Sequence, residues 1–187
     1  MSSILLIRHA QSQLAGRFCG SSDPPLSPAG EAEAQELAVR LRDSPIGHIY
    51  CSPLRRAVMT ANAIAAISGA LLTMMDGLRE IDFGKWEGLT WSEIELRDPH
   101  YARQWMEQFP NLSAPGGEPF EAFRQRVEDA FPHVQSEMKR NPSSAVAVVA
   151  HSGVLGVLLA RASGQPFRSI PAPANAAVFE MLGGEKY

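Results

Sequence analysis

Short apolar runs of strand length alternate along the chain with longer segments that have helical periodicity. This alternation is typical of an α/β protein with a largely parallel sheet. The expected strands are Ser3–Arg8, His48–Cys51, Leu71–Met74, Ala145–Ala150 and a last one near Ala177–Leu182. The fourth run is continuous and rich in β-branched residues, as expected of a central strand that is buried on both faces. The pattern predicts a three-layer sandwich in which helices flank a mostly parallel central sheet.

Helix signals occupy the stretches between these strands. Ser27-Pro28 places a serine N-cap before a first-turn proline and predicts a helix to about Asp43. Ser52-Pro53 repeats this pattern and predicts a helix to about Ser68, with Gly69 as its C-cap. The other expected helices are Thr90–Arg97, His100–Gln108, Phe120–Met138 and Gly153–Ser163. Pro132 should kink the third of these, because it removes a backbone donor and crowds the preceding turn.

Three loops complete the plan: a glycine-, serine- and proline-rich one at Ala15–Leu26, an ordered one at Asp76–Gly88, and another at Pro110–Pro119. We find no repeat, linker or low-complexity tract. With 187 residues and 45% apolar content, the chain has enough surface to bury one core. A single domain over residues 1–187 is therefore expected.

The net charge of −3 argues against any general attraction for nucleic acid or an anionic membrane surface. The apolar stretch Ala145–Ala160 is too short for a bilayer and is interrupted by His151-Ser152-Gly153. The first residues lack the basic region of a signal peptide. Cys19 and Cys51 have no metal-ligand spacing and are expected to be free thiols. These features predict a cytoplasmic protein with neither a nucleic-acid nor a membrane partner.

Charged or titratable residues follow four of the apolar runs: Arg8-His9, Ser52–Arg56, Glu80 and His151. Ligands of open α/β sheets bind at the carboxyl ends of the strands, so these residues should share one edge. Helix N-termini expected at Ser52 and Ser152 would add free N–H groups to that edge. The arrangement predicts an anion-binding site.

Plainer interpretations stay open for single residues. Arg8-His9 alone could form a surface ion pair, and Arg55 is interpreted as part of a solvated helix face. Asp82 could replace Glu80 as an acid, Glu87 is expected to be a structural partner of its loop, and His151 could be a core histidine. His48, His100 and His133 have no partner motif. Trp86, Trp91 and Trp105 are expected in core or lid packing, with one of them possible beside a substrate.

A metal site is not expected. No HxH, HExxH or paired-cysteine spacing occurs, and two arginines would oppose a cation. No cofactor is expected either. A small-molecule phosphate ester is the ligand that suits such a cluster of cations.

Five segments, in this order and spacing, resemble the histidine phosphatase or phosphoglycerate mutase-like superfamily: LLIRHAQS, CSPLRRAVMTA, LREIDFGKWEGLTWSEI, PGGEPFEAFRQRV and VVAHSGVL. The resemblance covers nearly the whole chain. It implies the phosphoglycerate mutase-like fold and a metal-independent phosphoryl transfer through a phosphohistidine. No cofactor is implied.

Residue by residue, the resemblance matches His9 to the nucleophile and Glu80 to the proton donor. It matches Arg8, Arg56 and His151 to the phosphate pocket. In the family pattern S-x-L-x-R-A the functional arginine directly precedes the alanine, and this position is Arg56 and not Arg55. Ser12 would offer a hydroxyl contact, and Ser152 begins the helix whose N–H groups would face the substrate. Nearby arginines should lower the pKa of His9, and an approaching dianion should raise the pKa of Glu80.

The chain departs from the family pattern at two places. Ala10 replaces the usual glycine, which a left-handed backbone would resist. No asparagine occurs between His9 and Leu26, where many members have one.

The short glycine-rich loop, the GSSDPPLSPAG turn and the DFGKWEG stretch resemble the bacterial α-ribazole phosphatases. This implies removal of the 5′-phosphate of α-ribazole 5′-phosphate or adenosylcobalamin 5′-phosphate in cobalamin synthesis. The segment 84–119 is expected to lie over the pocket as a helical lid. The alternatives are a broad-specificity sugar-phosphate phosphatase, a phosphoglycerate mutase and a non-catalytic phospholigand-binding protein.

Overall fold

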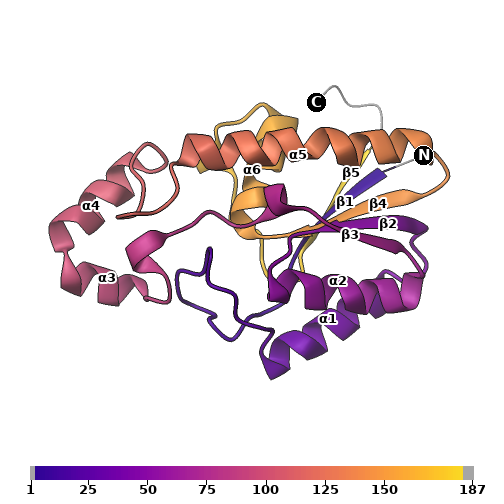
Figure 1. Ribbon diagram of the computed structural model, residues 1–187, viewed down its shortest axis with the longest axis horizontal. Coiled ribbons are helices and arrows are strands. Elements are labelled where there is room, and N and C mark those ends of the chain that lie inside the picture. Colours follow the sequence, from indigo (N-terminus) through magenta and orange to yellow (C-terminus); the bar gives the residue numbers. More distant parts are fainter. Residues whose placement is uncertain (1–2, 183–187) are drawn as a thin grey trace.

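Five strands form one sheet in the order β3-β2-β4-β1-β5 (Figure 1). The computed structural model describes residues 3–182. The strands are β1 (Ser3–Arg8), β2 (Ile46–Cys51), β3 (Leu71–Met74), β4 (Ala145–Ala150) and β5 (Val178–Leu182). The first four are parallel, and β5 runs antiparallel to β1 at one edge. The mostly parallel sheet is confirmed, and the carboxyl ends of β1, β2, β3 and β4 share one edge.

Helices cover both faces of the sheet, with α1 and α2 on one side and α5 and α6 on the other (Figure 1). The helices are α1 (Pro28–Arg40), α2 (Arg55–Ser68), α3 (Trp91–Arg97), α4 (Pro99–Gln108), α5 (Phe120–Arg140) and α6 (Ser152–Ser163). Three short 3₁₀ turns lie at Asp76–Leu78, Gly84–Trp86 and Phe167–Ser169. The predicted three-layer α/β architecture is confirmed.

The period-two geometry of β1 divides the core into two apolar layers. Leu5 and Ile7 pack with the α1–α2 layer, whereas Ile4 and Leu6 pack with the α5–α6 layer. Every residue of β4 is buried, as predicted for a central strand. Each fully buried aliphatic side chain contributes about 1.5–3 kcal/mol, so these two layers hold the sheet edge in place.

One helix start was predicted wrongly. α2 begins at Arg55 and not at Ser52, and its N-cap residue Leu54 makes no side-chain capping bond. The Ser52 hydroxyl accepts the N–H of Leu54 and lies 2.8 Å from Nε2 of His151, so Ser52 belongs to the turn before α2 and not to the helix N-cap. Gly69 caps the other end of α2 in a left-handed conformation, as predicted.

Other boundaries differ slightly from the expected ones. α1 ends at Arg40, three residues early, and β2 begins at Ile46, two residues early. Pro132 lies inside α5, which nevertheless continues to Arg140 as one helix (Figure 1). The long apolar stripe of α5 packs on the sheet on both sides of the proline, which holds the helix together there.

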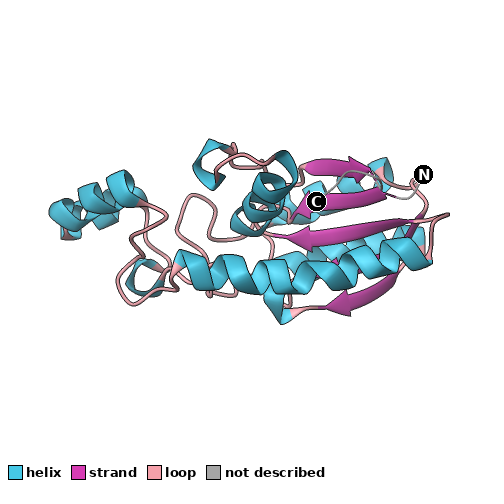
Figure 2. Cartoon of the chain, turned by 90° about the horizontal axis from the view of Figure 1, so that it is seen from above, coloured by secondary structure: helices cyan, strands magenta, loops and turns pink. Residues whose placement is uncertain are grey.

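α3 and α4 stand apart from the sheet at one end of the molecule (Figure 2). A capping box between Thr90 and Glu93 starts α3, and the Asp98 side chain caps α4. Trp86, Ile94 and Ala102 form the centre of a small separate apolar cluster under these helices. The two weak helical patterns of the sequence therefore correspond to real helices with strong caps.

Cys19 and Cys51 are free, as predicted. Within residues 3–182, no helix combines the length and the apolar character needed to cross a bilayer. The same residues contain no group of three or more histidine, cysteine or acidic side chains arranged to hold a metal ion.

Candidate active site

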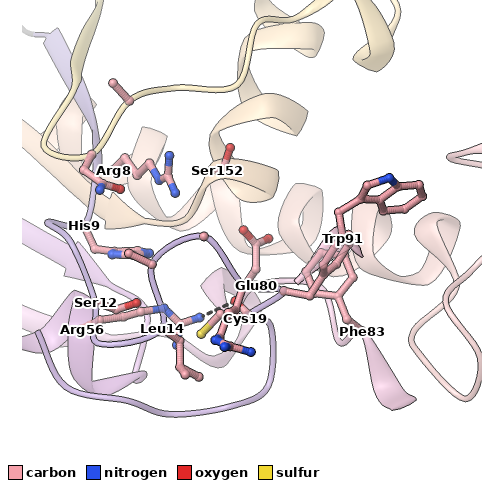
Figure 3. Close-up of a pocket in the computed structure, with 16 residues that line it drawn as sticks. Arg8, His9, Ser12, Leu14, Cys19, Arg56, Glu80, Phe83, Trp91 and Ser152 are labelled. Carbon is pink, nitrogen blue, oxygen red and sulfur yellow. Dashed lines mark hydrogen bonds between the residues drawn. The ribbon is translucent and has the colours of Figure 1, made fainter. Parts of the chain in front are cut away.

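The sheet edge holds a pocket of about 590 Å³ (Figure 3). Residues from well-separated segments line it, among them Arg8, His9, Ser12, Arg56, Glu80 and Ser152. His151 lies directly behind the wall, with its ring centroid 5.0 Å from that of His9. All seven residues singled out from the sequence thus come together at the carboxyl ends of the strands.

His9 directly follows β1 and is almost fully buried. Its Nδ1 lies 2.7 Å from the backbone oxygen of Ala10. A carbonyl oxygen can only accept, so the proton of the neutral ring is on Nδ1 and the lone pair is on Nε2. The Ala10 N–H donates in turn to the Thr60 hydroxyl on α2, at 3.1 Å, which fixes the backbone behind the ring.

The electrostatic surroundings keep this ring neutral. Burial, together with the charges of Arg56 and Arg8, lowers the pKa of His9 to about 3, against the opposing effect of the Ala10 hydrogen bond. At neutral pH the imidazole therefore has an available lone pair. The arginines do lower the pKa of His9, as expected from the sequence, but burial lowers it more.

The side chain of Arg56 is only 1% exposed, and it enters the pocket from the first turn of α2. Its guanidinium donates to the backbone oxygens of Ser22, Cys19 and Gly20 at 2.7, 3.1 and 2.9 Å. These bonds satisfy three of its five N–H groups, and the others remain available to a ligand. The cation is held in place before any anion binds.

Glu87 secures the same loop from the opposite side. Its carboxylate accepts the backbone N–H groups of Gly20, Ser21 and Ser22, and also that of Phe83. The loop is thus held by its carbonyls on Arg56 and by its amides on Glu87. Glu87 is a structural partner of the loop, as the sequence suggested.

Two polar atoms at this site are buried and have no hydrogen-bond partner among the described residues: Nε of Arg8 and Nδ1 of His151. The other groups of these residues are engaged, because Arg8 donates to the Pro173 carbonyl and Nε2 of His151 bonds with Ser52. Buried polar atoms almost always have partners, so the two free ones mark a place for a polar ligand. Burial, with His9 nearby, lowers the pKa of His151 well below its ordinary value.

Glu80 lies in the loop after β3, opposite the arginines (Figure 3). Its carboxylate accepts the N–H groups of Gly153 and Ile81, both at 3.0 Å. Burial raises its pKa above the ordinary value, and this effect exceeds the lowering by the two N–H groups and by Arg56 and Arg8. A raised pKa favours the protonated form of the carboxyl, which is the form that can donate a proton.

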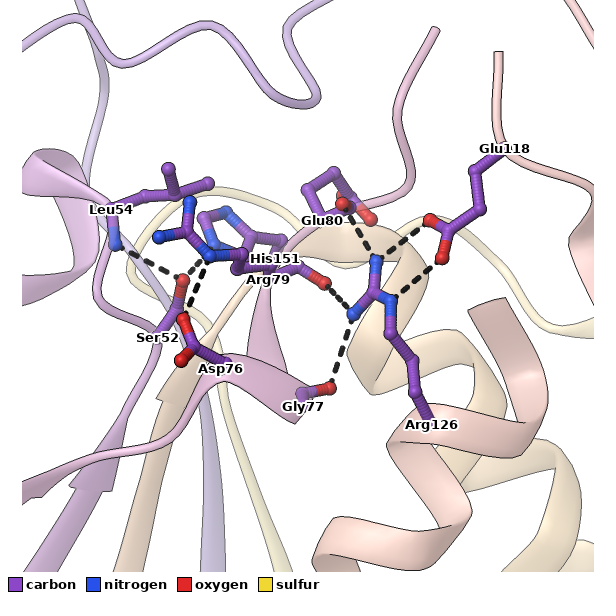
Figure 4. A network of polar contacts seen from close by, with 9 residues as sticks. All are labelled: Ser52, Leu54, Asp76, Gly77, Arg79, Glu80, Glu118, Arg126 and His151. Atoms are coloured by element: carbon purple, nitrogen blue, oxygen red, sulfur yellow. Dashed lines mark hydrogen bonds and ion pairs between the residues drawn. The ribbon is translucent and has the colours of Figure 1, made fainter. Parts of the chain in front are cut away.

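Arg126 of α5 holds the backbone that presents Glu80 (Figure 4). It donates to the backbone oxygens of Gly77, Arg79 and Glu80 at 3.2, 2.7 and 2.9 Å. It also forms a two-pronged ion pair with Glu118, with both N–O distances at 2.8 Å. One guanidinium therefore joins the helix, the loop and the segment before α5.

We expect Arg126→Met to reduce kcat about tenfold with alkyl phosphate esters and to change KM little. The substitution keeps the length of the chain but removes the hydrogen bonds that position Glu80, and each charged bond is worth about 1.5–3 kcal/mol. Arg124→Met is the matched control, because Arg124 forms its ion pairs with Glu121 and Glu128 on the same helix. Equal kcat values for the two variants would contradict a positioning role; thermal unfolding separates the effect on stability.

The alternatives from the sequence lie elsewhere. Arg55 is exposed, and its backbone N–H donates to Asp23. Asp82 accepts from the Ser21 hydroxyl and the Gly84 N–H, and it does not line the pocket. Geometry thus favours Arg56 over Arg55 and Glu80 over Asp82.

Sequence reasoning missed several residues of the pocket wall: Leu14, Ala15, Gly16, Arg17, Phe18, Cys19, Phe83, Ala174 and Asn175. Most of them lie in the loop after His9, whose composition predicts a loop but does not show which of its side chains face the pocket. Asn175 comes from the loop before β5, so an asparagine does reach the pocket, although from a distant segment. Ala10 does not have a positive φ, so its backbone does not require glycine.

Comparisons with known proteins agree with this geometry. The family model described as "Histidine phosphatase superfamily (branch 1)" matches residues 4–183. Phosphoserine phosphatase 1 of Hydrogenobacter thermophilus is 34% identical over 154 residues, which covers 81% of this chain and 72% of that protein. An adenosylcobalamin/alpha-ribazole phosphatase of Salmonella typhimurium is 30% identical over 173 residues, covering 88% and 81%.

Among solved structures, the alpha-ribazole phosphatase from Shigella flexneri superposes with a TM-score of 0.86 at 28% identity. The match covers 98% of this chain and 92% of that one. The relatives share the fold and differ in the substrates that their names state. The chain belongs to the histidine phosphatase superfamily.

Proposed function

We propose that this chain is a metal-independent phosphomonoesterase in which His9 forms a phosphohistidine. The observation that supports this most strongly is the neutral, buried imidazole of His9, with Nε2 free and two arginines and Glu80 in the same pocket. Nε2 attacks the phosphorus, the N–P bond forms and the ester P–O bond breaks. Glu80 donates its proton to the leaving alkoxide.

The second half of the cycle uses the same groups in reverse roles. Glu80, now a carboxylate, takes a proton from water, the water oxygen attacks the phosphorus, and the P–N bond breaks. Inorganic phosphate leaves and His9 is neutral again. Enzymes accelerate phosphate-monoester hydrolysis by up to about 10²¹-fold, which a single ion pair cannot supply.

The remaining groups of the pocket would hold the phosphate oxygens. Arg8 and Arg56 supply permanent cations, and Nδ1 of His151 and Nε of Arg8 are buried atoms that have no partner within residues 3–182. The Ser52 hydroxyl already accepts from Leu54, so its own hydrogen is available to Nε2 of His151 and would leave a proton on Nδ1. The Ser12 hydroxyl and the start of α6 at Ser152 complete the site.

For the natural substrate we propose α-ribazole 5′-phosphate or adenosylcobalamin 5′-phosphate, and hence a step in cobalamin synthesis. Support comes from the motifs of the loops and from relatives that bear this name. Phosphoserine is the second candidate, because a relative of higher identity is named as a phosphoserine phosphatase. A sugar-phosphate phosphatase would share every catalytic group, whereas a mutase would return the phosphoryl group to a second hydroxyl.

We also propose that residues 84–119 act as a lid within one domain. Trp91, from α3, lines the pocket, and α3 and α4 stand apart from the sheet at that end of the molecule (Figure 2). Segments with few contacts to the core are those that move at low cost in free energy. A cytoplasmic location stays a prediction from the sequence.

A panel of phosphate esters tests the proposed activity directly. We expect release of inorganic phosphate in the presence of a chelator, with the highest kcat/KM for α-ribazole 5′-phosphate or adenosylcobalamin 5′-phosphate. Phosphoserine, glucose 6-phosphate and 3-phosphoglycerate complete the panel. Loss of activity with chelator would contradict metal independence, isomerised phosphoglycerate would indicate a mutase, and tight phosphate binding without any turnover would indicate a binding protein.

A further inference from the structure

A second cavity, of about 180 Å³, adjoins the pocket at Glu80. The two share the wall residues Phe18, Glu80, Phe83 and Ser152. We call this second cavity the aromatic chamber. Its wall consists of Phe18, Glu80, Ile81, Phe83, Trp105, Phe109, Phe120, Phe123, Ser152, Gly153 and Phe167.

The rings of this wall pack against one another. Ring centroids are 4.9 Å apart for Phe18 and Phe83, 4.7 Å for Trp105 and Phe109, and 4.7 Å for Phe120 and Phe167. Such edge-to-face and tilted contacts are the arrangement that aromatic side chains prefer. The walls of the chamber are therefore a mutually supported set of rings rather than loose side chains.

Charge separates the chamber from the rest of the site. The main pocket is lined by His9 and the cations Arg8, Arg17 and Arg56, whereas Glu80 is the one ionisable residue of the chamber wall. Glu80 thus lies on the boundary between a cationic half and an aromatic half. Residues from the loop after His9, from α4, α5 and the turn Phe167–Ser169 contribute the aromatic half.

The position of Glu80 determines what the chamber would hold. To protonate the leaving oxygen, a general acid must lie within about 2.6–3.2 Å of it. The phosphate would lie among the cations of the main pocket, and Glu80, the proposed donor to the leaving oxygen, is a wall residue of the aromatic chamber as well. The carbon atom bonded to that oxygen would therefore lie beside the aromatic chamber.

The size and polarity of the chamber select the kind of alcohol. A dry cavity of about 150 Å³ is enough to bind benzene, so one flat ring fits. A third cavity of about 250 Å³ shares Phe109, Ser152, Gly153 and Phe167 with the chamber and leaves room for further groups. The ammonium and carboxylate of phosphoserine would lose solvation there, and the chamber wall has no cationic residue to pair with the carboxylate.

One wall residue offers a polar contact. Trp105 has a buried indole N–H without an acceptor among the described residues. A buried donor of this kind is costly, and a ring that contains an acceptor atom could satisfy it. The chamber therefore suits heteroaromatic as well as carbocyclic rings.

We propose that the aromatic chamber is the leaving-group subsite, and that this protein acts on phosphate monoesters of alcohols that bear a flat aromatic or heteroaromatic ring. The proposal rests on the proposed phosphatase activity and names the substrate class of that same site. It predicts discrimination by the alcohol and not by the phosphate.

The test compares 2-phenylethyl phosphate with ethyl phosphate, because the two leaving alkoxides have similar basicity and differ mainly in the ring. We expect kcat/KM to be about 10- to 100-fold higher for the phenyl ester, the range expected for burying one ring. Phe167→Ala should reduce this ratio severalfold, because the loss of one wall ring lowers kcat/KM more for the phenyl ester than for ethyl phosphate. Phe179→Ala, in β5 and outside the chamber, is the matched control.

The same comparison with phosphonates, which cannot be hydrolysed, does not depend on catalysis. We expect 3-phenylpropylphosphonate to bind at least about tenfold more tightly than propylphosphonate by calorimetry. Equal kcat/KM values, or equal Kd values if no ester is cleaved, would overturn the subsite proposal. Absence of turnover with a large Kd ratio would overturn only the phosphatase proposal. If Phe167→Ala does not fold, Phe109→Leu replaces it.

Discussion

His9→Ala is expected to abolish hydrolysis of every phosphate ester, with a loss of about 10⁴-fold or more in kcat. The imidazole forms the covalent bond in the proposed cycle, and no other described residue offers a neutral nitrogen lone pair at the same place. The side chain bonds to the backbone of its neighbour Ala10 and to no other residue in the described part of the chain, so its removal should leave the fold intact. Steady-state phosphate release measures the loss.

Rapid acid-free quenching with labelled ester provides the direct check, because a phosphohistidine is stable in base and labile in acid. Wild-type protein should trap the label, and His9→Ala should not. His133→Ala, at an exposed position of α5, is the matched control and should retain both turnover and label. A His9→Ala protein with more than a few per cent of wild-type activity would refute the covalent mechanism.

Glu80→Gln is expected to have the second-largest effect, a loss of about 10²- to 10⁴-fold in kcat with alkyl esters. An alkoxide needs a proton in order to leave, whereas a nitrophenolate leaves without one. The loss should therefore be small for p-nitrophenyl phosphate in the step that forms the phosphohistidine. Burst kinetics, which separate that step from hydrolysis of the intermediate, measure it.

The pH profile gives a second criterion for the same residue. The pKa of Glu80 is raised by burial, and its acid form is the active one for alkyl esters. Activity should therefore fall as the pH rises through this raised value, and the Gln variant should lose that limb of the profile. Asp82→Asn is the matched control, since Asp82 is the alternative acid. Equal loss with all esters, or a leaving-group dependence in Asp82→Asn, would count against Glu80.

The strands were predictable from their apolar runs. The shared edge was predictable because the carboxyl ends of parallel strands lie at the same edge of a sheet. The buried run at β4 and the residues after β1 and β4 placed His9 and His151 at the same edge without any knowledge of packing. Family motifs then separated Arg56 from Arg55. These inferences need only sequence spacing, and the structure agrees with them.

The aromatic chamber could not be predicted, for a physical reason. Phe18, Phe109 and Phe167 come from three loops that have no periodicity, and only the tertiary fold places their rings together. The wrong start of α2 has a similar cause. Ser52 lies in the turn before α2, where its hydroxyl accepts the N–H of Leu54 and contacts Nε2 of His151, ninety-nine residues away in the chain.

The strand order has a consequence for how the chain folds as it is made. β1 pairs with β4 and β5, both of which are translated after most of the chain has left the ribosome. Throughout that interval the apolar residues of β1 have no strand beside them, and an unpaired apolar strand is prone to aggregate. Completion of the sheet is therefore a late event, and until then β1 depends on other cover for its apolar side chains.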